Sequence, residues 1–197
     1  MTNTSDQARV VQEMGNRRAF LTRLTTVGMS LGLLGPGTLA KIASSAVAMK
    51  SGLTEKDFRM GVIGPAELSL VTSQLAVQQA TQANAKEFAG FELREAVAVI
   101  TVLKELGTPV PPMDVKAKAT LAKIRAARGM DFDRAYIKAQ HDNHIFLRDL
   151  ATAYLKNTTP NEKSPAEQQG RHLATLALNQ FTEHVELTAR ILKELQS

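Results

Sequence analysis

The sequence contains no cysteine, no tryptophan and only two tyrosines in 197 residues. Without cysteine the chain can form no disulfide bond, thiolate metal site or iron–sulfur cluster, and it has no cysteine nucleophile. Residues 49–197 also lack a Gly-rich phosphate loop, a Gly-x-Ser-x-Gly elbow and a His-Glu-x-x-His motif.

The composition is rich in Ala, Leu, Glu, Lys and Gln, which favours helices. The formal net charge is +5, but it is unevenly distributed. Residues 1–48 carry five basic and two acidic side chains, whereas residues 49–197 carry 19 basic and 17 acidic ones. The larger part of the chain is nearly neutral, so we expect no nucleic-acid partner.

Residues 1–48 have the three-part layout of an export signal, with a basic region, an apolar region and the small residues Ala46-Val47-Ala48. Arg17-Arg18, followed by Phe-Leu after one alanine, resembles a twin-arginine signal. Glycines and Pro36 interrupt the apolar region short of the ~18–20 residues that a membrane helix needs.

We therefore expect residues 1–48 to be a twin-arginine-type signal peptide, cleaved after Ala48. The expected partners are the twin-arginine export machinery and a signal peptidase. Residues 49–197 would then form a periplasmic domain, free or envelope-associated, without stable membrane insertion after cleavage. Retention of the signal as an anchor is the alternative. The resemblance implies a pathway that carries folded proteins, often with a cofactor already inserted.

Helical spacing and capping signals predict four long helices and one short one. Gly107 and the prolines that follow it end the second helix, and a break or kink is expected at Gly64-Pro65 in the first. This pattern favours an all-α fold, an antiparallel four-helix bundle with a short extra helix between the second and third long helices. The predicted helices are 54–82, 84–106, 114–128, 131–156 and 165–195.

The apolar stripe of the second long helix contains a carboxylate, Glu95, and Glu92 lies at the edge of that stripe. A buried carboxylate is costly unless it is paired, hydrogen-bonded or bound to a metal. The rest of the stripe is Phe88, Phe91, Val99, Val102 and Leu106. Polar residues accompany the other long stripes as well: Glu67 at the edge of the first, His144 on the third and His184 on the last.

A metal centre is one interpretation of these residues, because Glu and His suit iron, manganese or zinc. Dinuclear bundle sites use Glu-x-x-His on two helices, and no helix here has that motif on its inner face. A mononuclear or incomplete dinuclear site for a divalent ion would remain. The candidate ligands are Glu67, Glu92, Glu95, His144 and His184.

A hydrogen-bonded polar layer is the other interpretation, and such layers can fix the register of a bundle. Its members would be Glu95, His144, His184, Gln140 and Gln180, together with Tyr136. Counting residues to the intervening loop places His144 and His184 on the order of 10 Å apart along the bundle axis, unless the loop or a late start of the last helix absorbs the difference. This offset favours the polar layer over the metal centre.

The short helix at 114–128 carries five basic residues against Asp114, with a thin apolar side made by Val115, Ala119, Ala122 and Ile124. It is expected to be a solvated helix that bridges two longer ones. Docking to an anionic partner is the weaker alternative. The basic residues are Lys116, Lys118, Lys123, Arg125 and Arg128.

Several of these motifs together resemble the exported bacterial domain-of-unknown-function 4142 family, over about residues 54–195. The best match is Phe132-Asp133-Arg134-Ala135-Tyr136, followed by Gln140, His144 and the inward His184; Glu67, Phe88-Ala89 and the short helix before Asp131 fit the same layout. The resemblance implies a ferritin-like bundle located at the outer membrane or in the periplasm. The family commonly has an Asp-His pair in the second helix, where this chain has Glu95 and Ala96. The resemblance therefore implies either that a family-wide metal site is lost in this chain or that its ligand set is shifted toward Glu92 and Glu95.

The leading functional hypothesis from the sequence is a non-catalytic exported bundle that serves envelope stress or maintenance. The alternative is a metal-binding oxidoreductase or storage protein. The third hypothesis is an interaction module that uses the helix at 114–128.

Overall fold

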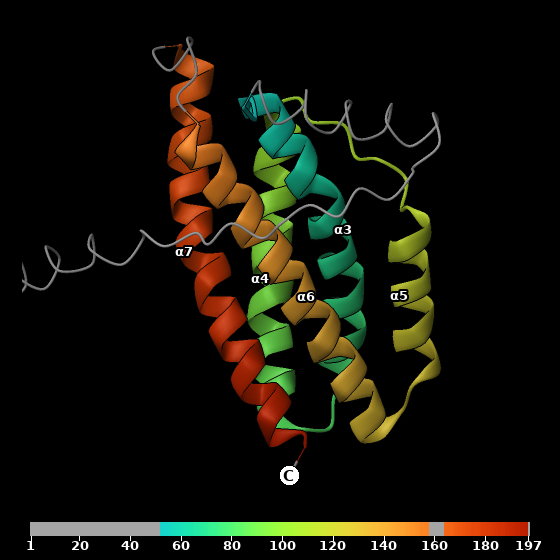
Figure 1. Cartoon of the computed structure of the whole chain (residues 1–197). Helices are drawn as coiled ribbons and strands as arrows, with labels where there is room; N and C mark the ends of the chain where they lie inside the picture. The colour runs from blue at the N-terminus through green and yellow to red at the C-terminus, as the bar shows by residue number, and fades with distance from the viewer. Residues whose placement is uncertain (1–51, 158–163, 197) are drawn as a thin grey trace, which may run out of the picture. The chain divides into compact units, whose positions relative to one another are not determined.

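The computed structural model describes residues 52–157 and 164–196 (Figure 1). This part of the chain is helical with no strands, which confirms the all-α prediction. The predicted signal peptide, with Arg17-Arg18 and the cleavage site after Ala48, lies outside the described residues. The described helices are α3 (Glu55–Gln79), α4 (Ala83–Glu105), α5 (Val115–Ala126), α6 (Gly129–Lys156) and α7 (Pro165–Glu194).

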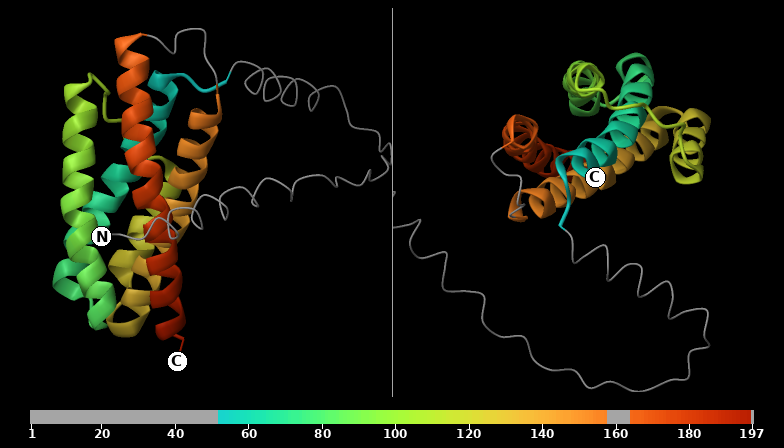
Figure 2. Two further views of the ribbon diagram at one scale, coloured as in Figure 1. Left: turned by 90° about the vertical axis from the view of Figure 1, so that its left-hand side faces the viewer. Right: turned by 90° about the horizontal axis from the view of Figure 1, so that it is seen from above.

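The four long helices run side by side. The first two long helices along the chain pack on one another, and so do the last two. α4 packs closely on α3, and α7 packs closely on α6. The two pairs are joined mainly through α3, which touches α6 and, less extensively, α7. α5 lies on the outside against α3 and α6 (Figures 1 and 2). α4 and α7 are not among the closely packed pairs, so side chains fill the space between them.

Capping residues set several of the helix ends. Thr54 and Asp57 form a capping box at the start of α3, and the side chains of Asp114 and Ser164 accept hydrogen bonds from the first turns of α5 and α7. Gly107, at φ +74°, follows α4 in the left-handed region, as expected for a helix terminator.

Of the break or kink predicted at Gly64-Pro65, the break is wrong, because α3 continues through Pro65. Packing on α4 and α6 holds the helix together there and outweighs the local preference for a break. By length and composition alone, α3 is also the one described helix that could cross a membrane. Core helices pass the same test, and α3 packs against the four other described helices.

The buried face of α4 differs from the predicted stripe. Phe91 and Val102 are 45% and 39% exposed, and the buried face is centred on Glu92 rather than on Glu95. Three alanines flank Glu92 on the buried face, and this face allows α4 to pack closely on α3. The buried residues of α4 are Ala85, Phe88, Ala89, Glu92, Ala96, Ile100 and Leu103.

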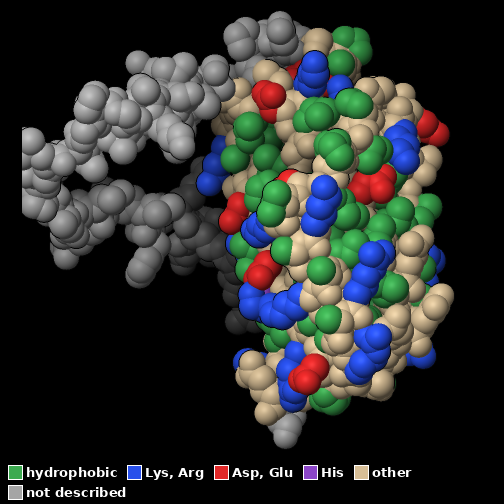
Figure 3. Space-filling view, turned by 90° about the vertical axis from the view of Figure 1, so that its right-hand side faces the viewer, with side chains coloured by type: hydrophobic (Ala, Val, Ile, Leu, Met, Phe, Trp, Pro, Cys, Tyr) green, Lys and Arg blue, Asp and Glu red, His purple; other side chains and the backbone are tan. Residues whose placement is uncertain are grey.

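The buried side of α5 agrees with the prediction only at Ile124. Val115 is 85% exposed, while Leu121 and Ile124 are buried. Leu121 and Ile124 are three residues apart and therefore share the face that points toward the bundle. The basic residues of α5 spread over the outer surface among other side chains (Figure 3), as expected of a solvated bridging helix.

The core consists of two apolar clusters that meet near the middle of the long helices. One cluster contains Phe58, Tyr154 and Phe181, and the other contains Phe88 and Phe132. The His144 ring contacts a phenylalanine from each cluster, with centroids 6.2 Å from Phe88 and 6.0 Å from Phe181. His144 therefore marks the junction, and it is there that the polar side chains gather.

Asp133 is a fully buried carboxylate that holds the turn between α3 and α4. It accepts hydrogen bonds from the backbone N–H of Thr81 (3.1 Å), the hydroxyl of Thr81 (2.6 Å) and the backbone N–H of Gln82 (2.8 Å). Asp133 thereby ties α6 to the start of α4. This contact gives Asp133, the second residue of the Phe132–Tyr136 motif, a structural role.

Replacing Asp133 with alanine is expected to lower the free energy of unfolding by about 3 kcal/mol, because charged hydrogen bonds contribute about 1.5–3 kcal/mol each and buried donors are left unpaired. Urea denaturation measures this loss. Asp131→Ala is the matched control, since that side chain is 81% exposed and pairs only at the surface with Arg134. Equal losses in the two variants would contradict the assignment.

Candidate metal centre

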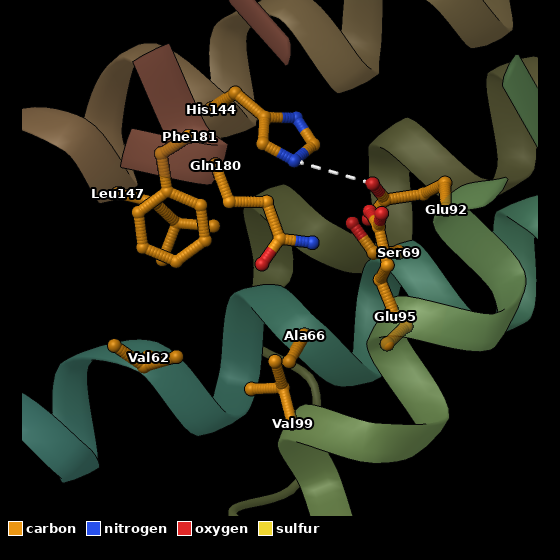
Figure 4. A pocket seen from close by; sticks show the side chains of 11 residues that line it. Val62, Ala66, Ser69, Glu92, Glu95, Val99, His144, Leu147, Gln180 and Phe181 are labelled. Atoms are coloured by element: carbon orange, nitrogen blue, oxygen red, sulfur yellow. Dashed lines mark ion pairs between the residues drawn. The ribbon is translucent and has the colours of Figure 1, made fainter. Parts of the chain in front are cut away.

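Three potential ligand atoms from three helices converge in the core. Glu92 Oε2 of α4 lies 3.3 Å from His144 Nε2 of α6 and 3.0 Å from His184 Nδ1 of α7. The two ring nitrogens are 3.0 Å apart. All three residues are buried, with 2–4% of their surface exposed. Among the described residues this is the one group of three metal-ligating side chains that comes together; Figure 4 shows the Glu92–His144 pair.

The triangle has the size that a metal ion requires. Two ligand atoms bound at about 2.1 Å are about 3.0 Å apart at right angles and about 3.4 Å apart at the tetrahedral angle. The observed edges of 3.0–3.3 Å fall within this range. One ion could therefore reach all three atoms without a rearrangement of the helices.

His144 is oriented so that its free electron pair faces the triangle. Its Nδ1 lies 2.8 Å from the backbone carbonyl of Gln140, an acceptor, so Nδ1 carries the hydrogen. In the neutral ring Nε2 then carries an electron pair directed toward Glu92. Histidine ligands of metal ions typically donate the other ring N–H to a carbonyl or carboxylate in this way.

His184 has the same organisation with the two nitrogens exchanged. Its Nδ1 faces the triangle, and its Nε2 lies 3.0 Å from Glu95 Oε2. Within the described part of the chain that oxygen has no hydrogen-bond partner of good geometry, so the contact is an ion pair. The Glu95 carboxylate therefore contacts the ring nitrogen of His184 that faces away from the triangle. The phenyl ring of Phe88 fixes the other side of His184, at a centroid distance of 5.1 Å.

Without a metal, ion pairs between the histidines and the carboxylates hold the cluster together. Burial alone would raise the pKa of Glu92, but the neighbouring His144 and His184 outweigh burial and lower it to about 2. Burial disfavours the charged form of His184, yet the adjacent carboxylates of Glu92 and Glu95 raise its pKa to about 9. The pKa of Glu95 is lowered as well, because His184 and Gln180 overcome the effect of burial. At neutral pH the metal-free cluster therefore contains an imidazolium between carboxylates.

A small cavity of about 20 Å³ adjoins the cluster (Figure 4). Glu92, Glu95, His144, Gln180 and Ser69 contribute its polar wall. The remainder is apolar and comes from all four long helices. These apolar lining residues are Val62, Ala66, Ala96, Val99, Leu147 and Phe181.

Of the five predicted ligand candidates, the structure brings Glu92, His144 and His184 together and places Glu95 directly behind His184. Glu67 lies apart from them and is excluded from the group. Its carboxylate pairs with Lys104 at 3.6 Å, and its side chain is 20% exposed. The edge position of Glu67 on its stripe explains this, since an edge residue can turn toward a neighbouring surface cation.

The predicted polar layer is divided into separate groups. Gln140 is buried but bonds to α3, accepting from Ser69 at 2.9 Å and donating to Thr72 at 3.0 Å. Tyr136 bonds to Ser73 at 2.9 Å. These contacts use small polar residues of α3 that lie on its buried face. Only Gln180 remains beside the histidine–carboxylate cluster, where it lines the cavity.

The predicted axial offset of about 10 Å between the two histidines is wrong, since their ring nitrogens are 3.0 Å apart. The estimate assumed that α7 starts level with the end of α6. Instead α7 extends past that end (Figures 1 and 2), which brings His184 level with His144.

Sequence reasoning missed the central position of Glu92, although a signal for it was present. Ala85, Ala89 and Ala96 lie at helical spacing around Glu92 and mark a face that packs closely. It also missed the backbone carbonyl of Gln140 as the partner of His144, because the sequence shows side chains and not which carbonyl a ring will reach.

A comparison with protein families matches residues 43–188 to the family described as Domain of unknown function (DUF4142). The chain belongs to this family. The matched region includes all of α3–α6 and most of α7, so the DUF4142 domain of this chain contains Glu92, His144 and His184 together. Searches of curated proteins and of solved structures gave no match.

Proposed function

We propose that this DUF4142 protein binds one divalent transition-metal ion through Glu92, His144 and His184. The observation that carries the proposal is the convergence of their three ligand atoms, all within 3.3 Å of one another. Two histidines and one carboxylate with open positions form a set that suits iron(II) in particular. Manganese and zinc, which accept the same ligand types, are outcomes of metal analysis.

The orientation of the rings supports this proposal over a purely structural polar layer. Three electron-rich atoms share one small space, and each ring already places its other nitrogen against an oxygen. A single metal ion would accept an electron pair from each of the three atoms and would balance the negative charge of Glu92. In its absence, the imidazolium of His184 performs part of that role. In this proposal the ion pairs among Glu92, His144 and His184 are the metal-free state of the same site.

The proposal also covers the fold of the protein and its cellular location. The pairing of α3 with α4 and of α6 with α7 supports an antiparallel four-helix bundle of ferritin-like type. The twin-arginine-type pattern at residues 1–48 supports export to the periplasm by that machinery, with cleavage after Ala48. A site loaded before export would fit a pathway that carries folded proteins. Of the two metal roles, a redox or binding role fits better than storage, because the cluster has room for one ion.

The test is a cobalt(II) titration of mature chain purified from the periplasm and stripped with a chelator, followed by visible absorption. We expect saturation at about one ion per chain, with ligand-field bands of an ion bound by nitrogen and oxygen. Elemental analysis of the unstripped protein identifies the native metal. Failure to bind cobalt, iron(II), manganese or zinc would leave the non-catalytic bundle as the function.

A further inference from the structure

We infer that the open coordination position of this centre accepts only ligands of two or three atoms, the size class of dioxygen, and excludes organic co-substrates. This inference rests on the proposed metal site and adds the class of ligand that reaches it. It is carried by the size, lining and opening of the cavity beside Glu92 and His144.

The cavity is small enough to discriminate by size. Its volume of about 20 Å³ exceeds the ~10–15 Å³ that one water molecule needs, measured in the same way. An organic dicarboxylate of about ten non-hydrogen atoms does not fit within this volume, and the inner wall consists of core side chains that are nearly fully buried. Val62 and Leu147 are each 3% exposed and Ala66 is 6% exposed, so the inner wall has no free side to move into.

The lining also selects by polarity. Apart from the polar residues named above, the wall is aliphatic or aromatic, and no Lys or Arg lines it to bind an organic carboxylate. Centres that bind such co-substrates need a complementary charge or donor for the far end of the molecule. A diatomic or triatomic ligand needs none, since its contact with the metal supplies the affinity.

The route of access lies between α4 and α7. Three lining residues are partly exposed, Glu95 and Val99 of α4 and Gln180 of α7, and the rest are more deeply buried or belong to other helices. α4 and α7 are also not closely packed on one another. A ligand would thus pass Val99 and the Glu95–Gln180 pair to reach the metal position.

The experiment is a ligand series on the cobalt(II)-loaded wild-type protein, with azide and 2-oxoglutarate as probes. Azide is expected to change the visible spectrum saturably, whereas 2-oxoglutarate at the same concentrations leaves it unchanged. Binding of 2-oxoglutarate, or no binding of azide to the loaded protein, would overturn the inference. The absence of cobalt binding would instead remove the proposed function, on which the inference rests.

A variant pair localises the route. Val99→Phe fills the opening and is expected to weaken azide binding by about 10-fold or more, with cobalt affinity retained. Val97→Phe is the matched control, because Val97 is 49% exposed on the outer side of α4 and does not line the cavity. Equal azide affinity in the two variants would place the route elsewhere and overturn this part of the inference. The wild-type series decides the size class independently of either variant.

Discussion

Glu92→Gln is expected to lower the affinity for cobalt(II) by more than about 100-fold, because it removes the only anionic atom of the triangle while keeping the size of the side chain. Loss of a residue that merely supports a ligand typically costs about 10–100-fold, so loss of the ligand itself must exceed that. Equilibrium titration against a chelator of known affinity measures the change.

Two further variants on α4 serve as comparisons for Glu92→Gln. Glu95→Gln is expected to fall within the 10–100-fold range, since Glu95 contacts His184 Nε2 and not the triangle. Glu87→Gln is expected to leave the affinity unchanged, because Glu87 is exposed on the same helix. If the Glu95 variant loses more affinity than the Glu92 variant, the assignment of the carboxylate ligand is wrong.

His184→Ala is expected to lower the free energy of unfolding of the metal-free protein by about 3–5 kcal/mol at pH 6, the cost of removing one partner of a buried ion pair. The reason is that Glu92, with 6% of its side chain exposed, loses the cation that compensates its charge. Chemical denaturation in the presence of a chelator measures the loss. His172→Ala is the control on α7, because His172 is exposed.

The pH dependence of this loss follows from the direction of the shift. The pKa of His184 is raised from 6.5 to about 9 in the folded chain. Its stabilisation is therefore complete below pH 6.5 and disappears as the pH rises through 9. The lowered pKa of Glu92 adds stability that is present above pH 4.5 and is lost toward pH 2.

The difference between wild type and His184→Ala should therefore shrink between pH 6 and pH 10. At pH 10 it should approach the cost of lost packing alone, about 2 kcal/mol. A difference that stays constant over this range would mean that His184 carries no charge in the folded metal-free chain.

The sequence predicted the helices well because their signals are local. Capping residues such as Thr54, Asp114 and Ser164 predicted helix starts that the structure confirms. The buried face of α6 also follows its sequence pattern, since Leu147 and Tyr154 lie at helical spacing from His144 and all three are buried. On that helix large apolar residues alternate clearly with charged ones.

The face of α4 could not be derived in the same way. Hydrophobicity favoured the stripe with Phe91 and Val102, whereas the close approach of α3 and α4 selected the alanine face that contains Glu92. The outcome depends on how α3 and α4 fit together, and the sequence of either helix alone does not show this. The predicted position of Val115 failed for a related reason, since a short helix such as α5 buries only the few residues that its neighbours can reach.

The relative heights of the histidines depend on tertiary geometry as well. The sequence identified both His144 and His184 as inward polar residues, but counting residues misjudged their distance. Where α7 starts relative to α6 depends on the connection between them and on the packing of both helices, so the triangle could not be derived from spacing alone.

X-ray anomalous scattering from crystals of the cobalt(II)- or iron(II)-loaded protein tests the metal centre most directly. The account predicts one strong peak in the core, about 2.0–2.2 Å from Glu92 Oε2, His144 Nε2 and His184 Nδ1, with Glu95 behind His184. Crystals soaked in the metal that show no peak among these three atoms, with Glu92 and His184 still in direct contact, would contradict it.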